Sequence, residues 1–195
     1  MPPIDLIPAA ERLAALARSV PDERLGDRTP CPAFAIGDLL DHVDGFCAAF
    51  TAAATKTRLE PTGSIAQGGD AANLGDAWRT RIPAALEGLV AAWADPEAWT
   101  GTTHIAAAGD LPGEVAGLVV LDELVVHGWD LARSLGQPFA GADQEAALLV
   151  PFVRGFDGPR SADGPFAPIV GVPVEAGPLD QLLGLTGRDP GWAPA

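Results

Sequence analysis

Residues 113–136, GEVAGLVVLDELVVHGWDLARSLG, limit the fold of this chain more than any other stretch. Apolar residues fill most of the run, which is long enough for about six turns of α-helix. Gly136 and Pro138 supply a helix stop signal at its end. The segment therefore predicts a long and largely buried helix, yet Glu123 and His127 sit in the middle of it.

Apolar residues recur at helical spacing in three further segments. Pro8 is compatible with the first only if it lies in the opening turn, and Pro83 should bend or break the third. The second carries a continuous apolar stripe that includes Leu39, Val43 and Phe46. Long helices are predicted over residues 4–19, 36–55 and 71–95.

The remaining segments are shorter or irregular. Residues 97–112 change in composition and predict a short hairpin or an irregular crossover. Short helices are predicted over 142–154 and 178–187. Four long helices with one long crossover indicate an all-α four-helix bundle with short extra C-terminal helices. We expect residues 1–155 to form this metal-binding bundle, with 156–195 as a Gly/Pro-rich extension packed on the same domain.

The overall charge argues for a protein that handles small molecules. The net charge is −14, with 11 arginines against the single Lys56, which disfavours nucleic acid and anionic membranes as partners. No 18-residue run is free of polar residues, and the N-terminus does not resemble a signal peptide. Two cysteines are too few for a disulfide framework. We expect a cytoplasmic protein with a small-molecule substrate and a homodimer as one oligomeric option.

Three side chains on the apolar helices suggest a metal site. Glu123 and His127 lie one turn apart on one helix face, about 6 Å along its axis. A carboxylate in apolar surroundings is costly unless it is paired or binds metal. His42, from the apolar second helix, would supply a third ligand. Three N/O donors leave a coordination position open, as catalytic metal sites do. The alternatives are an ordinary helix pair and a core histidine.

Several neighbours are candidates for supporting roles. Asp44 and Asp130 could each orient an imidazole. Arg133 could anchor a substrate, although a solvated position at the helix end is the simpler interpretation. Trp129 could line the pocket, although a core position is favoured.

The remaining histidine and the cysteines lie outside this group. Cys31 sits in the Pro-bracketed stretch TPCPAF, where packing against the second helix is favoured over a nucleophilic role. Cys47 falls on the apolar stripe and is expected in the core. His104 lies in the crossover, where a surface or structural role is favoured.

Two stretches resemble a known family. RTPCPAFAIGDLLDHV (28–43) and LDELVVHGWDLARSLGQP (121–138) are similar to the two signatures of the DinB-like, mycothiol-dependent maleylpyruvate isomerase superfamily. The closing segment LLGLTGRDP (182–190) also resembles part of that group. Ala35 stands where the family often has a Ser or Thr helix cap. The sequence departs from the isomerase in lacking the additional C-terminal domain of that enzyme, which argues against isomerisation of maleylpyruvate.

The resemblance implies a four-helix bundle with a divalent metal at His42, Glu123 and His127. Zinc is the first expectation, and nickel, iron or manganese would also suit the donors. It further implies mycothiol or another low-molecular-weight thiol as cofactor or co-substrate. The first hypothesis is a metal-dependent thiol S-transferase or isomerase. The alternatives are a metal-dependent hydrolase using metal-bound water and a non-catalytic metal-binding stress protein.

Overall fold

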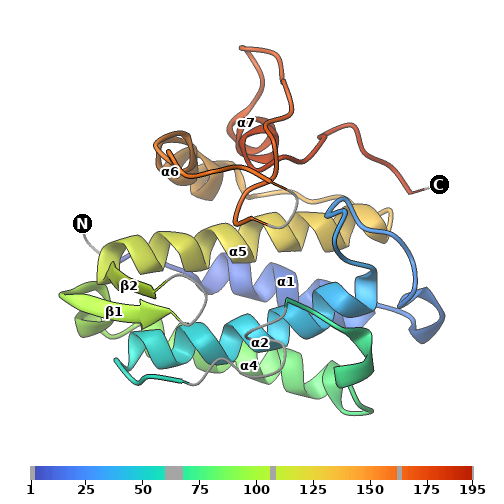
Figure 1. Cartoon of the computed structure of the whole chain (residues 1–195). Coiled ribbons are helices and arrows are strands. Elements are labelled where there is room, and N and C mark those ends of the chain that lie inside the picture. The colour runs from blue at the N-terminus through green and yellow to red at the C-terminus, as the bar shows by residue number, and fades with distance from the viewer. Residues whose placement is uncertain (1–2, 60–67, 106–108, 162–163, 195) are drawn as a thin grey trace.

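Four long helices form a bundle in the computed structural model (Figure 1), which describes residues 3–59, 68–105, 109–161 and 164–194. The bundle helices pack side by side, with α1 against α4 and α5, and with α2 also against α4 and α5 (Figure 1). This arrangement confirms the all-α bundle expected from the sequence. The bundle helices are α1 (Ile7–Ser19), α2 (Ile36–Ala54), α4 (Trp78–Trp93) and α5 (Gly113–Ser134).

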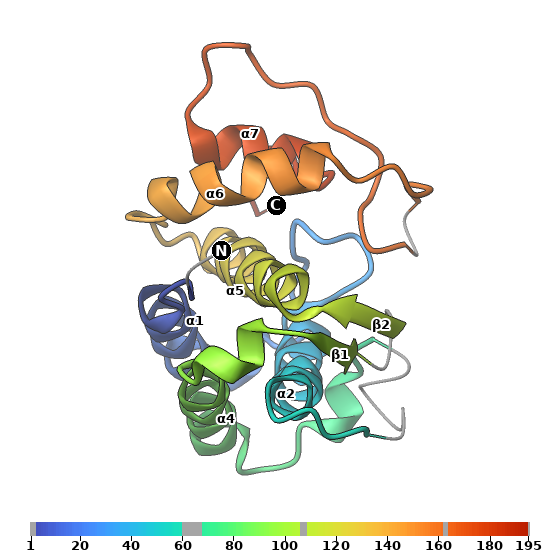
Figure 2. The same cartoon turned by 90° about the vertical axis from the view of Figure 1, so that its left-hand side faces the viewer.

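Helix α5 is the central element. Figures 1 and 2 show it between the other bundle helices and a second layer made of α6 (Asp143–Arg154) and α7 (Pro178–Leu185). Residues on opposite sides of α5 are buried for this reason: Leu124 and Val126, two positions apart and so on nearly opposite sides of the helix, are both at most 3% exposed. The apolar sequence of α5 thus reflects cover from two layers. One continuous hydrophobic core reaches from α1 to Leu182 of α7.

The predicted division of the chain at residue 155 remains a prediction. Helix α6, on one side of that position, packs closely against α7 on the other and also against α5. The ion pair between Arg12 of α1 and Glu145 of α6 ties this second layer to the bundle.

The crossover between α4 and α5 contains the predicted hairpin. Strand β1 (Thr102–Ile105) pairs antiparallel with β2 (Gly109–Pro112), after the short 3-10 helix η3 (Pro96–Trp99). Trp99 is buried, and its indole nitrogen donates a hydrogen bond to the carbonyl of Trp93. The crossover therefore contributes to the core.

The third predicted helix begins later than the sequence pattern indicated. Residues 71–77 do not join α4; they form the 3-10 helix η2 (Ala71–Asn73) and a turn. Asp70 caps η2 through the Ala72 amide, and Gly75 has φ +58°, a value that interrupts a right-handed helix. Pro8 lies in the first turn of α1, as predicted. Pro83 lies inside α4, which continues past it, and a bend at this residue stays a prediction.

No helix in the described ranges combines the length and the apolar character needed to cross a bilayer.

The packing of α5 on the crossover depends on a glycine. A Cβ added at Gly117 would come within 2.2 Å of the Trp99 ring. We expect Gly117→Ala to lower the free energy of unfolding by about 1–3 kcal/mol through overpacking. Gly88, exposed on α4 with nothing near its Cβ position, is the matched control. Gly88→Ala should stabilise by about 0.5–1 kcal/mol. Urea denaturation measures both, and equal effects would contradict this packing.

Candidate metal centre

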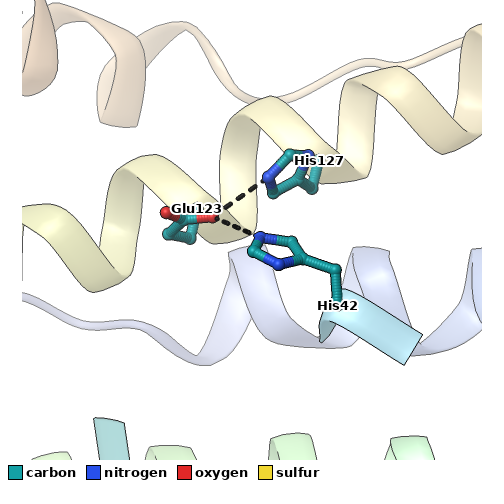
Figure 3. A group of neighbouring side chains, drawn as sticks. All are labelled: His42, Glu123 and His127. Carbon is teal, nitrogen blue, oxygen red and sulfur yellow. Dashed lines mark hydrogen bonds and ion pairs between the residues drawn. The ribbon is translucent and has the colours of Figure 1, made fainter. Parts of the chain in front are cut away.

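The three predicted donors converge in the structure. His42 reaches across from α2 toward Glu123 and His127 on α5, as Figure 3 shows. Oε2 of Glu123 lies 3.3 Å from Nε2 of His42 and 3.0 Å from Nε2 of His127. The ligand atoms of all three lie within 4.8 Å of one another, so the group could hold a metal ion. His127 is buried, and the other two are half-buried.

The start of α2 is fixed without the usual cap. Ala35, at the N-cap position, has no side-chain acceptor, but the Asp38 carboxylate reaches back to accept a hydrogen bond from the Ala35 amide at 3.0 Å. An acidic residue in the first turn also suits the helix dipole. The missing Ser or Thr is thereby replaced, and α2 holds His42 about two turns beyond this N-cap.

The His127 ring is oriented from its far side. Its Nδ1 lies 3.0 Å from Oδ2 of Asp130, a carboxylate with no exposed surface. An ionised carboxylate can only accept, so Nδ1 carries the proton and Nε2 of the neutral ring presents a lone pair. That lone pair faces the Glu123 carboxylate. Two acceptors at 3.0 Å require a positive charge between them, either a proton or a metal ion.

The protonation equilibria show the same demand for positive charge. Burial lowers the pKa of His127, but hydrogen bonds to Asp130 and Glu123 outweigh it and raise this pKa to about 9. Burial raises the pKa of Glu123, but hydrogen bonds from His127 and His42 outweigh it and hold this pKa well below its usual range. Without metal, a proton on His127 therefore takes the place that a cation would fill. The donors fit a divalent metal.

The donors open onto a pocket of about 450 Å³. The loop before α2 contributes one wall, and the segment around α7 contributes the other. The Phe34 ring packs on the His42 imidazole with 5.0 Å between centroids, which limits rotation of that imidazole. Besides the three donors, the lining residues include Cys31, Phe34, Pro165, Ala167 and Arg188.

Cys31 lies in this pocket wall, where sequence reasoning favoured simple packing. The side chain of Thr29 fixes the turn: its hydroxyl lies 2.8 Å from the Phe34 carbonyl and 3.2 Å from the Cys31 amide. Burial raises the pKa of the Cys31 thiol, so this group is a neutral thiol at neutral pH. Cys47 is buried in the core, as expected.

The predicted supporting residues divide into two sets. Asp130 contacts the His127 imidazole, as described above. The Asp44 carboxylate instead accepts a hydrogen bond from Nε of Arg81 at 2.8 Å, and the two side chains form an ion pair. Trp129 is buried, in keeping with the core interpretation. Arg133 donates to the carbonyls of Pro190 and Trp192. It therefore binds the C-terminal backbone, which neither of its sequence interpretations foresaw.

Arg188 is the main site residue that sequence reasoning missed. It is 8% exposed, lines the pocket and binds Asp130. The only signal was its place in the segment LLGLTGRDP, 182–190. His104, the third histidine, binds Asp110 on the hairpin instead, at 2.7 Å, and lies outside the site.

Comparison with known proteins agrees with this geometry. The family described as "Mycothiol maleylpyruvate isomerase N-terminal domain", a DinB-like superfamily domain, matches residues 6–132, well over half of the chain. The chain belongs to this family. The family is metal-binding and mycothiol-associated.

Two curated relatives, both from Mycobacterium tuberculosis, are similar over nearly their whole length. They are "Uncharacterized protein MT0763" of strain CDC 1551 / Oshkosh and "Uncharacterized protein Rv0738" of strain ATCC 25618 / H37Rv. Each is 30% identical over 185 residues, which cover 92% of this chain and 93% of the relative. No solved structure matches this chain.

Metal binding at this site should release a proton at pH 7. With a pKa of about 9, His127 is protonated there and must lose its Nε2 proton to bind metal. The apparent zinc affinity should therefore rise about tenfold per pH unit between roughly pH 6 and 9. Calorimetry in buffers of different ionisation enthalpy counts the protons released. Binding heats that are independent of the buffer would contradict this arrangement.

Proposed function

We propose that this protein is a metal-dependent thiol S-transferase or isomerase of the mycothiol type, acting on a small electrophilic substrate in the cytoplasm. The observation that supports it most is the open geometry of the site. In the described ranges, three N/O donors meet at one side of a 450 Å³ pocket, and they leave the pocket side free for a ligand. Family membership supports a thiol as that ligand.

The metal ligands in this proposal are His42, Glu123 and His127, with zinc as the first choice. When bound there, zinc would supply the charge that keeps a coordinated thiol deprotonated at neutral pH. Asp130 keeps the proton of the neutral His127 ring on Nδ1, so the lone pair of Nε2 is available to bind the metal. A half-buried Glu123 adds one negative charge, so the site retains a net positive charge that attracts a thiolate.

The pocket walls limit what the substrate can be. Pro32, Ala33, Pro165 and Ala167 offer apolar, small side chains, which suit an uncharged or partly apolar body. Among the described lining residues, Arg188 is the one that carries a guanidinium, and this group already binds Asp130. This lining favours a compact electrophile as the substrate.

The ligand set is tested by histidine substitutions. His42→Ala and His127→Ala should each lower zinc content to below about a tenth of an ion per chain, because two donors do not hold the metal tightly. His104→Ala, at the hairpin, should keep the wild-type content and serves as the matched control. Elemental analysis gives the metal content, and far-UV circular dichroism checks the fold. Stoichiometric metal in both site variants would show that the ligand set is wrong.

The reaction class is tested by the thiol requirement. Zinc-loaded protein should convert small electrophiles only when mycothiol or a related thiol is present, and His127→Ala should reduce the rate by at least about 100-fold. Chromatography with mass detection follows the thiol adduct or the isomer. Turnover without any thiol would instead indicate hydrolysis. Tight zinc binding with no turnover across a broad panel of thiols and electrophiles would indicate a binding protein.

A further inference from the structure

The segment after α7 reaches back to the centre of the molecule through Arg188. Nη2 of Arg188 donates to Oδ2 of Asp130 at 3.0 Å, and Nε of Arg188 donates to Oδ1 of the same carboxylate at 3.4 Å. The other terminal nitrogen donates to the Thr186 carbonyl at 3.0 Å. The guanidinium thus holds both oxygens of one carboxylate while it is itself held by its own chain. A two-point grip of this kind fixes the plane of the carboxylate.

Asp130 transmits this orientation to His127. Its side chain is fully buried, and Oδ2 contacts both the guanidinium and Nδ1 of His127, each at 3.0 Å. Rotation of the carboxylate would break the contact with the imidazole. Because the contact between Asp130 and Nδ1 fixes the rotation of the imidazole about its Cβ–Cγ bond, the position of Nε2 relative to Glu123 depends on how Asp130 is held.

The segment that carries Arg188 is itself fixed in place. The Arg188 amide donates to the Leu183 carbonyl at 2.8 Å, which closes the end of α7. Gly187 has φ +86°, and a Cβ there would meet Ala167 at 2.5 Å, so this turn accepts glycine and little else. Beyond it, Arg133 of α5 donates to the carbonyls of Pro190 and Trp192.

We propose that Arg188 is a positioning residue for the metal centre: it holds Asp130, and through it His127, in the orientation that binds metal. This inference rests on the proposed metal site at His42, Glu123 and His127. It makes the C-terminal segment part of the metal centre, although the family match ends at residue 132. The contact is to a ligand's partner, and no contact of Arg188 with metal or substrate is needed.

The sign of the effect separates orientation from charge. Arg188 is a cation near a site for a cation, so by charge alone its removal should strengthen zinc binding. Loss of orientation should weaken it, by about 10–100-fold for a partner of a metal-bound histidine. We expect Arg188→Met to weaken zinc binding by at least about tenfold. Arg188→Lys, which keeps the charge but lacks the planar fork, should also weaken it measurably.

Arg154→Met is the matched control. Arg154 lies on α6, is exposed and contacts only Gln181 among its described partners, so this variant removes the same charge from the same layer. Its zinc affinity should stay within about twofold of wild type. Competition with a chromophoric chelator gives the affinities. The visible spectrum of the cobalt-loaded protein reports ligand geometry and should change in Arg188→Met and not in Arg154→Met.

A measurement on the wild-type protein does not depend on how a variant folds. If docking of Arg188 favours metal binding, zinc must favour docking by the same free energy. Zinc should therefore slow hydrogen exchange at the amides of Arg188 and Trp192, which donate to the carbonyls of Leu183 and Asp189.

Three outcomes separate the claims. Wild-type protein that refuses zinc overturns the proposed function, and this inference with it. Wild-type protein that binds zinc, with equal or tighter binding in Arg188→Met, overturns the inference alone. Exchange in this segment that is unchanged by zinc also overturns it.

Discussion

The attraction between the Glu123 carboxylate and a positive charge beside it is the interaction on which the centre of this molecule depends. Glu123 lies on the largely buried helix α5, and its carboxylate faces two imidazole nitrogens at 3.0 and 3.3 Å. Because Asp130 holds the proton of His127 on the far nitrogen, the near nitrogen and the carboxylate would repel each other without a cation between them. The pKa of His127 is raised to about 9, so without metal a proton bound to this imidazole supplies the positive charge. A divalent metal meets the same demand and leaves the pocket side open.

The two layers around α5 explain how such a polar group is kept in a small helical protein. The bundle supplies His42 from α2, and the segment after α7 supplies Arg188, which offsets the charge of the buried Asp130. Burial raises the pKa of Asp130, but the Arg188 charge and the His127 hydrogen bond outweigh it and lower this pKa. A chain of paired charges therefore runs from the solvent-facing pocket to the buried side of α5. Removal of one member takes away part of the charge that offsets its neighbour, which is costly where that neighbour is buried, as Asp130 is.

Local patterns were sufficient to predict much of this from the sequence. The helical stripes located α1, α2 and α5, because each of these helices buries a continuous face. The spacing of Glu123 and His127 placed them on one side of α5, and His42 was on the apolar stripe that faces it. The late start of α4 was missed because the turn at Gly75 and the capping of η2 by Asp70 interrupt an otherwise helical composition.

Contacts between distant segments were beyond the reach of sequence patterns. Nothing in the local sequence says that Arg188 meets Asp130, since 58 residues separate them. The local sequence also does not indicate that Asp44 pairs with Arg81 on α4, or that Arg133 binds backbone carbonyls near the C-terminus. Periodicity gives the face on which a side chain lies and the distance along one helix. The partner is decided by tertiary packing.

Anomalous X-ray diffraction at the zinc edge, from crystals grown with zinc, is the most direct test of the central claim. The account predicts one strong anomalous peak bounded by Nε2 of His42, Nε2 of His127 and the carboxylate of Glu123, on the side that faces the pocket. A zinc-containing crystal with no peak among these three side chains would contradict it, because the repulsion at Glu123 would then be relieved by a proton alone.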